Sequence, residues 1–314
     1  MRPWSEAMTI AALYKTYRFF RPDLVHHVTS KPVLYGTPVA RMTGVRAVVN
    51  AISGMGSNFD HDLGASGILS SVLAAGYRTA LRHPNMKVIF QNRSHQKEFV
   101  RRGWVRAEQS VLIRGAGVDT QVFAPSEVGL QDVPLVVLVS RMLHRKGIHD
   151  FVEAARRLRS ERIKARFALI GDPDPDNADS IQEQQLRAWH EEGSVEYWGR
   201  REDIADLLRT AAISCLPTHL PEGVPKSLIE SAACGLPIVT TDIPGCRELV
   251  ADGVNGFVVA LHDVEALVAA LRTLLNDPAL RLRMGKAGRA RVLEEYSLPR
   301  VVNEHLAVYQ ELLA

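Results

Sequence analysis

The sequence of 314 residues contains no run of 18 or more apolar residues, the length a membrane-spanning helix needs. Its first residues interrupt their apolar positions with Glu6, Lys15 and Arg18, which is unlike a signal peptide. Only three cysteines occur, at positions 215, 234 and 246, and no two form a C-x-x-C pair. This argues against a disulfide framework or a cysteine metal site. We therefore expect a cytoplasmic protein with buried free thiols.

A large net charge is also lacking, because the formal charge is only +3, but the charge is unevenly distributed. Residues 1–120 carry 16 Lys and Arg against 7 Asp and Glu, whereas residues 121–314 carry 22 against 28. A basic first part suits an anionic partner such as a membrane surface, a lipid phosphate or a nucleic acid. A solvated surface without a partner explains the same counts equally well.

What is present is an alternation of apolar strand segments and helical patterns. In the second half, "PLVVLVS", "ARFALIG", "VEYWG", "AISCLP", "LPIVTTD" and "GFVVA" read as strands separated by helices, which predicts a doubly wound parallel sheet. The first half repeats this rhythm more weakly, and a linker is expected near 119–133. We expect two facing Rossmann-like domains at 1–120 and 121–297, and a helix at 298–314 that packs back toward the first domain.

The front of the first domain lacks the opening strand and glycine-rich turn of a doubly wound fold. The chain begins with a helix over 5–20, in which Leu13, Tyr17 and Phe20 form a core stripe, and then enters the strand "LVHHV". We expect this strand inside a sheet, with one edge unpaired, and an N-terminal domain that is incomplete by about 65 residues, judged from the size of βα units.

The segment "PEGVPKSLIESAACG" (221–235) is the main candidate for chemistry. Pro225 suits the first position of a helix, so the amides of Lys226, Ser227 and Leu228 become free donors for an anion. Glu230 follows roughly 7.5 Å along the axis, where it can meet a ribose diol. Glu222 precedes the helix and can accept hydrogen bonds from hydroxyls beyond the diphosphate. This pattern fits a nucleotide sugar.

A second segment, "SRMLHRKG", begins where the strand "PLVVLVS" ends. Ligands of open α/β sheets lie at the carboxyl ends of the strands, which is where Arg141 and Lys146 fall. Two cations there can neutralise a departing diphosphate without a proton donor. Two solvated loop cations are the alternative explanation.

These segments, with "LIGD", "VEYWGRREDIADLL" and "GCRELVADGVNGFVV" in order, resemble the C-terminal domain of family 4 retaining glycosyltransferases of the GT-B fold. The resemblance covers about 118–314. Upstream, "RPDLVHHVTSKPVLYGTPVARMTGVRAVVNAISGMGSNF" is similar to a bacterial subgroup that extends polyprenyl-diphosphate-linked saccharides for surface polysaccharides. The resemblance implies a hexosyltransferase that uses a nucleoside diphosphate sugar, with UDP as the subgroup's usual nucleotide.

The resemblance also implies roles for individual residues. The catalytic group would be Glu222, which holds donor sugar hydroxyls, with Arg141 and Lys146 on the diphosphate. "RGAGVD" matches a hinge-side glycine motif and includes Gly117, and Gly199 with Tyr197 and Trp198 would border the base. The expected donor-binding residues are Glu230, Gly117, Pro225, Lys226, Ser227, Leu228, Gly199 and Trp198.

The remaining signals leave alternatives open. The family's H-x-H pattern reads His26, His27, Val28 here, which favours a structural histidine over a catalytic one. His61 and Asp62 read as loop polar residues, so no metal or other cofactor is expected. The expected partners are the donor, a lipid-linked saccharide acceptor and an anionic membrane surface at the inner face of the plasma membrane, without nucleic acid. An inactive nucleotide-sugar-binding protein and a nucleotide-sugar epimerase are the alternative functions.

Overall fold

The computed structural model describes residues 3–52, 76–126 and 132–314. The chain divides into two compact units: the first comprises residues 1–115, 221–223 and 299–314, and the second comprises 116–220 and 224–298. The break between them falls after Gly115, slightly before the linker expected near 119–133. The sequence also predicts a loop rich in Gly and Ser at 53–67 and a helix over 68–82. The loop, with His61 and Asp62, and most of that helix lie outside the described residues, and residues 76–80 are helical.

The first unit is built on a parallel sheet with the order β1-β2-β3-β4. Its elements are α1 (Pro3–Phe20), β1 (Leu24–Val28), α2 (Ser30–Thr43), β2 (Ala47–Ile52), β3 (Met86–Phe90), α5 (Arg93–Arg101), β4 (Ser110–Leu112) and most of α13 (Leu298–Leu313). Among the described strands β1 pairs only with β2, so "LVHHV" forms an edge of this sheet.

Both faces of the first sheet are covered, because alternate strand residues point to opposite sides. Val48 and Val88 join one buried cluster with residues of α2 and α5. Val49 and Ile89 join a second cluster, which includes Val301, Val308 and Leu312 of α13. The last helix of the chain is therefore part of the first unit's core.

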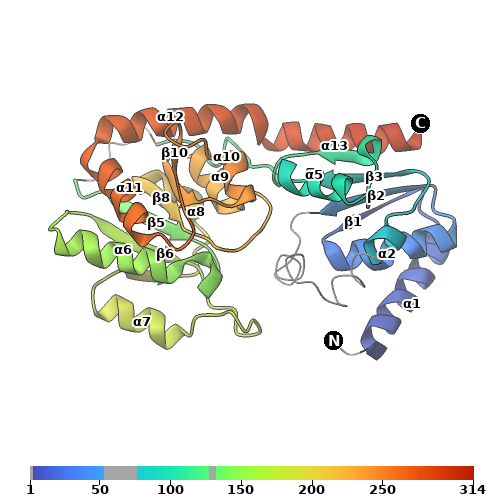
Figure 1. Cartoon of the computed structure of the whole chain (residues 1–314), viewed down its shortest axis with the longest axis horizontal. Helices are drawn as coiled ribbons and strands as arrows, with labels where there is room; N and C mark the ends of the chain where they lie inside the picture. The colour runs from blue at the N-terminus through green and yellow to red at the C-terminus, as the bar shows by residue number, and fades with distance from the viewer. Residues whose placement is uncertain (1–2, 53–75, 127–131) are drawn as a thin grey trace. The chain divides into compact units, whose positions relative to one another are not determined.

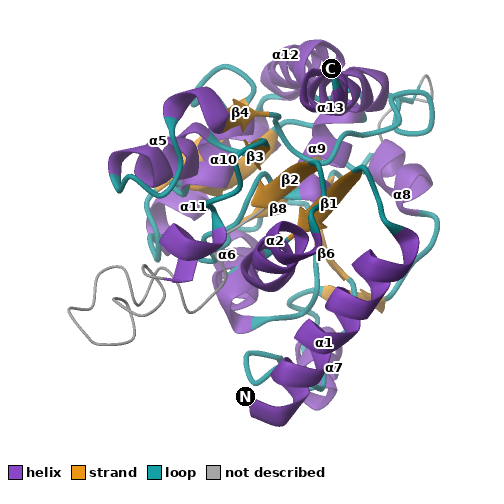
Figure 2. Cartoon of the chain, turned by 90° about the vertical axis from the view of Figure 1, so that its right-hand side faces the viewer, coloured by secondary structure: helices purple, strands orange, loops and turns teal. Residues whose placement is uncertain are grey.

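Helix α1 lies alongside α2 (Figure 2). Leu13 and Tyr17 are half-buried, but Phe20 is 72% exposed, so the expected core stripe is wrong at its third position. The helix ends at Phe20, whose ring meets the exposed ring of Phe19 edge-on.

The second unit is built on a six-stranded parallel sheet with the order β10-β9-β8-β5-β6-β7 (Figure 1). Its strands are β5 (Leu135–Val139), β6 (Arg166–Ile170), β7 (Glu196–Gly199), β8 (Ile213–Leu216), β9 (Ile238–Thr241) and β10 (Gly256–Val259). Its helices are α6 (Ile148–Ser160), α7 (Glu183–Glu191), α8 (Ile204–Thr210), α9 (Lys226–Ala233), α10 (Pro244–Leu249), α11 (Val264–Asn276) and α12 (Pro278–Glu295).

The central strand β5 shows why the run "LVVLV" has no polar alternation. Val136 and Leu138 belong to one core cluster, while Leu135 and Val137 belong to another on the opposite face. A parallel sheet covered by helices on both sides requires apolar residues at every position. The expected strands of this half are confirmed, and the doubly wound parallel sheet with them.

Candidate functional site

The strand order of the second unit places a switch point between β5 and β8. From β5 the chain proceeds to β6 and β7 on one side, while β8, β9 and β10 extend the sheet on the other side. Connections leave such neighbouring strands in opposite directions, which opens a crevice at their carboxyl ends. Arg141 and Lys146 follow β5, and the approach to α9 follows β8, so both predicted segments border this crevice.

Direct contacts join the loops that follow β5 and β8. Gly147 has φ +74°, and a Cβ added there would lie 1.9 Å from the carbonyl oxygen of Pro217, so only glycine fits. The amide of His219 donates to the carbonyl of Arg145 at 2.8 Å, and the Thr218 hydroxyl donates to the same oxygen at 3.3 Å. The loop that carries Lys146 is thus held against the segment that leads toward α9.

Lys146 and Arg141 differ in their surroundings. Lys146 ends the short 3₁₀ turn His144–Lys146 and is only 7% exposed. The Arg141 side chain is 60% exposed and donates from Nη1 to Asp174 Oδ2 at 2.7 Å. An exposed ion pair of this kind contributes about 0–1 kcal/mol, so Arg141 can exchange Asp174 for another anion at little cost.

The N-terminus of α9 offers two backbone donors rather than three. Pro225 was expected to be the first helical residue. It is instead the N-cap (φ −60°, ψ 123°), and the helix begins one residue later, at Lys226. The Leu228 amide donates to the Pro225 carbonyl at 3.1 Å, so the expectation that it is a free donor is wrong. Within the described chain the amides of Lys226 and Ser227 have no acceptor. Tightening of the first turn into a 3₁₀-type bond satisfies the third amide internally.

Glu230 lies one turn along α9 from Lys226, and its side chain is only 12% exposed. Its Oε1 is 3.5 Å from Lys226 Nζ. Burial raises the pKa of the Glu230 carboxyl, and the neighbouring Lys226 offsets only part of this effect. Burying a carboxylate without full compensation is unfavourable, and hydroxyl donors of a ligand would relieve it.

A cavity of about 550 Å³ opens beside this crevice at the carboxyl ends of β5 and β6. It is lined by Val139, Ser140, Arg141, Ile170, Gly171, Asp172, Pro173, Asp174, Pro175, Arg200, Arg201 and Ile204. Sequence reasoning identified only Arg141 in this set. The charged lining residues that the sequence did not point to follow β6 and β7: Asp172, Asp174, Arg200 and Arg201. Their position directly after strand ends is the signal that could have identified them.

The other expected donor residues are less closely grouped. Glu222 is half-buried and, with residues 221–223, belongs to the first unit. Gly117 is buried with φ +76°, two residues after the break between the units. Gly199 has φ +63° and accepts a hydrogen bond from the Gly171 amide at 2.8 Å. The indole of Trp198 donates to Glu196 at 3.1 Å, and neither Gly199 nor Trp198 lines the 550 Å³ cavity.

The two histidines of β1 are held by protein groups. His27 is buried, with Nδ1 2.8 Å from Asn50 Oδ1 and Nε2 2.8 Å from the Tyr17 hydroxyl. His26 Nδ1 lies 2.8 Å from the hydroxyl of Tyr309 on α13. Burial lowers the pKa of His26 to about 4. Both side chains link β1 to the elements packed around it.

Within the described residues, one group has the composition of a metal site: Asp150, His219 and His262, whose ligand atoms lie within 4.8 Å of one another. His219 Nε2 lies 2.8 Å from Asp150 Oδ2, which is an ordinary hydrogen-bonded pair. One carboxylate and two imidazoles are ligands that suit transition metals. None of the residues expected to act on the donor belongs to this group.

Three comparisons relate this chain to known proteins. The family model described as "Glycosyl transferases group 1" matches residues 123–291. A Campylobacter jejuni protein named N,N'-diacetylbacillosaminyl-diphospho-undecaprenol alpha-1,3-N-acetylgalactosaminyltransferase is 25% identical, over 96% of this chain and 80% of its own length. An Escherichia coli protein named UDP-Gal:alpha-D-GlcNAc-diphosphoundecaprenol alpha-1,3-galactosyltransferase is 24% identical, over 97% and 79%.

Among solved structures, Anabaena Alr3699/HepE in complex with UDP superposes with a TM-score of 0.78 at 22% identity. The match covers 96% of this chain and 81% of that chain. At this identity the likeness concerns the fold, and it confirms the expected pair of Rossmann-like domains of the GT-B type.

Proposed function

The chain belongs to the family of group 1 glycosyl transferases, and from this membership we propose that it moves a sugar from a UDP-linked donor to a polyprenyl-diphosphate-linked saccharide. Membership of this family means that the chain is a glycosyltransferase. The proposed transfer retains the anomeric configuration of the donor sugar. Two relatives named for diphospho-undecaprenol acceptors support the acceptor, and a fold neighbour with bound UDP supports the nucleotide. The observation that carries the proposal is the contact of Gly147 with Pro217, which holds the two predicted segments at one crevice.

Each side chain has a role in this reaction. The diphosphate lies at the amides of Lys226 and Ser227, where the helix dipole favours negative charge. Lys146 and Arg141 neutralise the charge that grows on the diphosphate as its bond to the sugar breaks. Glu230 accepts hydrogen bonds from the ribose, and Glu222 accepts them from sugar hydroxyls. The acceptor hydroxyl forms the new bond on the same face, and its proton passes to the departing phosphate oxygen.

The remaining proposed contacts concern shape. Pro225 holds the entry to α9 in an extended conformation, and Leu228 anchors the first turn in the core, where it is fully buried. Gly199 and Trp198 border the base from the end of β7, and Gly117 lies where the chain passes between the units. No metal takes part, because the cations and amides supply the neutralisation.

The test is transfer to a synthetic polyprenyl-diphosphate saccharide from a panel of UDP-sugars, with Lys146→Ala compared with Lys164→Ala. Lys164 is exposed at the end of the same helix-to-strand unit and serves as a charge-matched control. Loss of a preorganised charge at the leaving group lowers kcat by about 10²–10³-fold, and the control stays at the wild-type rate.

The alternatives give different products. A binding protein without activity would retain UDP-sugar and release no UDP with any acceptor. An epimerase would interconvert two UDP-sugars in the absence of acceptor. Either result would replace the proposed reaction.

We also propose that α1 rests on an anionic membrane. Trp4, Met8 and Phe19 are 85%, 72% and 80% exposed and share one face of the helix with Lys15. Aromatic and cationic side chains on one helix face are typical of helices that lie in the membrane interface. No helix among the described residues has both the length and the apolarity needed to cross a bilayer.

Sedimentation with vesicles tests this association. Trp4→Ala with Phe19→Ala should reduce binding to vesicles that contain phosphatidylglycerol, whereas Leu282→Ala, at an exposed apolar position of α12, should not. Higher salt should weaken binding because the basic first part of the chain contributes. Equal binding of all variants, or equal binding to neutral vesicles, would exclude α1 as the membrane contact.

A further inference from the structure

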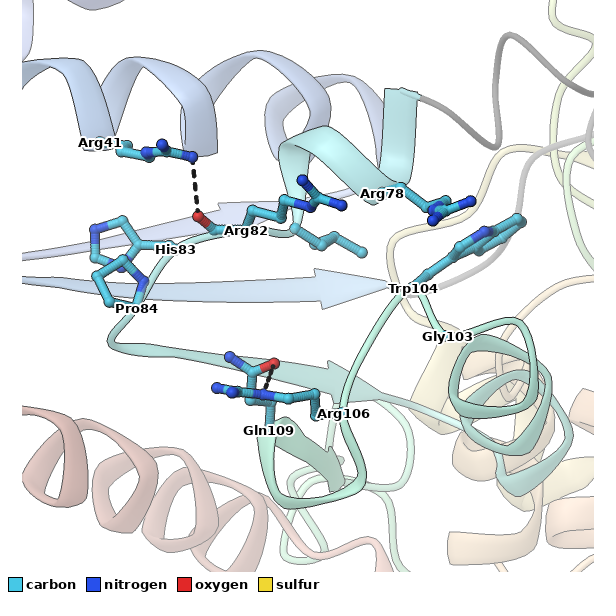
Figure 3. Close-up of a pocket in the computed structure, with 10 residues that line it drawn as sticks. Arg41, Arg78, Arg82, His83, Pro84, Gly103, Trp104, Arg106 and Gln109 are labelled. Carbon is cyan, nitrogen blue, oxygen red and sulfur yellow. Dashed lines mark hydrogen bonds between the residues drawn. The ribbon is translucent and has the colours of Figure 1, made fainter.

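The first unit contains a second cavity, of about 590 Å³, that the proposed reaction does not use (Figure 3). We call it the basic pocket. It is lined by Arg41, Arg78, Leu81, Arg82, His83, Pro84, Gly103, Trp104, Arg106 and Gln109. Four of these side chains are guanidinium groups, and none of the described residues that line the pocket is a carboxylate.

The basic pocket lies at the amino edge of the first sheet. His83 and Pro84 precede β3, Gln109 precedes β4, and Arg41 lies in the last turn of α2, which leads into β2. Open α/β sheets bind their substrates at the opposite, carboxyl edge. The pocket is therefore separate from any acceptor surface at the carboxyl ends of the same strands.

The arginines project from opposite walls. Figure 3 shows Arg41, Arg82 and Arg78 on one side, and Arg106 and Gln109 on the other. Arg41 Nη1 donates to the Arg82 carbonyl at 3.4 Å, and Arg106 Nε donates to Gln109 Oε1 at 3.2 Å. These bonds orient two guanidinium groups and leave most of their N–H donors for a ligand.

Buried side chains support the walls. His83 is 5% exposed and lies between two carbonyls, with Nδ1 2.9 Å from Asn85 O and Nε2 3.1 Å from Val45 O. Trp104 is also 5% exposed, and Arg102 covers its ring at 5.1 Å. The arginines thus extend from a packed base.

The charges of the basic pocket are only partly balanced. Arg106 pairs with Glu108 at 3.0 Å. Arg41, Arg78 and Arg82 have no carboxylate partner in the part of the chain that the structure describes. Clustered like charges repel, and a bound anion removes that repulsion. Guanidinium groups bind phosphate oxygens in a bidentate manner, which makes phosphate the matching anion.

We propose that the basic pocket binds a phosphate-bearing anion at a site independent of the sugar donor. The cavity has room for a diphosphate with an attached group, so both a phospholipid headgroup and a soluble phosphate ester satisfy this chemistry. The proposal stands on the first unit alone and does not depend on the glycosyl transfer proposed above.

The experiment measures binding of inorganic pyrophosphate by calorimetry in the presence of saturating UDP, which occupies the donor site. Wild-type protein should bind pyrophosphate, and the double variant Arg41→Ala/Arg82→Ala should bind it at least about tenfold more weakly, as expected for losing two charge-assisted contacts. The control is Arg283→Ala/Lys286→Ala, which removes two exposed cations from α12 and should bind like wild type.

A second arm identifies the source of the phosphate. If the headgroup is the ligand, the same double variant binds phosphatidylglycerol vesicles more weakly than wild type, and pyrophosphate competes with the vesicles. If a soluble phosphate is the ligand, pyrophosphate binding falls and vesicle binding does not. Absence of pyrophosphate binding with UDP present, together with unchanged vesicle binding by the variant, overturns the proposal.

The variants must be compared as folded proteins. UDP affinity should be the same in wild type and both double variants, because the groups proposed to hold UDP, namely the amides of Lys226 and Ser227 with Glu230, Arg141 and Lys146, belong to the second unit. Should the alanine variant fail to fold, Arg41→Lys/Arg82→Lys keeps the charge and removes the bidentate geometry, so it should weaken pyrophosphate binding while retaining salt-dependent attraction.

Discussion

At the residue scale, Glu230 combines burial with a functional position. Its folded pKa is raised, so the fold favours the neutral acid, and the stability this form contributes is lost as the pH rises through the folded pKa. Glu230→Gln should therefore leave the free energy of unfolding at pH 7 unchanged or higher. The same change should weaken UDP binding by about 1–3 kcal/mol, the range for hydrogen bonds to a charged group.

Calorimetry with UDP and chemical denaturation check the two halves of this prediction. Glu191→Gln, at an exposed position of α7, is the matched control and should change neither quantity. A variant of Glu230 that loses stability and keeps its UDP affinity would show that the carboxylate supports the fold instead of the ligand.

His95 makes the first unit sensitive to acid. It is 3% exposed, its Nδ1 lies 3.0 Å from Asn92 Nδ2, and burial lowers its pKa to about 4. The unfolded chain binds the proton more tightly, so stability is lost as the pH falls from about 6.5 toward 4. From pH 7 to pH 5 this histidine alone accounts for on the order of 2 kcal/mol.

Urea denaturation at the two pH values tests this with His95→Gln, which should show a smaller loss of stability on acidification. His190→Gln, at an exposed position of α7, should keep the wild-type pH dependence. Equal pH dependence in all three proteins would assign the acid sensitivity to other groups, such as His26.

At the element scale, α13 completes a domain far from it in sequence. Val301, Val308 and Leu312 cover one face of the first sheet, where they pack with Val49 and Ile89. Val308 is 5% exposed, whereas Val302 on the same helix is 44% exposed. Val308→Ala should lower the free energy of unfolding by about 2 kcal/mol, since it removes buried methyl groups and leaves a cavity.

Val302→Ala provides the control within the same helix, and its expected effect is within about 0.5 kcal/mol. Denaturation followed by tryptophan fluorescence measures both variants. If the two substitutions lower the free energy of unfolding by the same amount, α13 does not contribute its apolar face to the core.

At the scale of the whole molecule, the proposed reaction runs without a metal. Treatment with EDTA should leave the transfer rate within about twofold of the untreated rate, because amides and cations neutralise the diphosphate. This test is demanding because the chain contains one group of side chains, Asp150, His219 and His262, with the composition of a metal site among its described residues. A loss of activity that Mn²⁺ or Zn²⁺ restores, and that His262→Ala reproduces, would assign a metal to that group.

The sequence by itself determined the elements of the second unit and the position of the candidate site along them. Runs such as "PLVVLVS" are apolar at every position because the strand is buried on both faces, so a local pattern reports a parallel sheet. Arg141, Lys146 and α9 follow strand ends, and ligands of such sheets lie at strand ends. The pattern was sufficient because each signal lies within one short segment.

Only the tertiary structure decided which of these segments meet. Gly147 contacts Pro217, which lies 70 residues later in the sequence. The start of α9 has two free amide donors instead of the three expected, because its first turn tightens. Phe20 is exposed although it has helical spacing from Tyr17. The basic pocket draws its arginines from segments around residues 41, 78, 82 and 106, none of which has a motif. Contacts between distant segments depend on strand order and on how side chains pack between elements, and a local pattern carries neither.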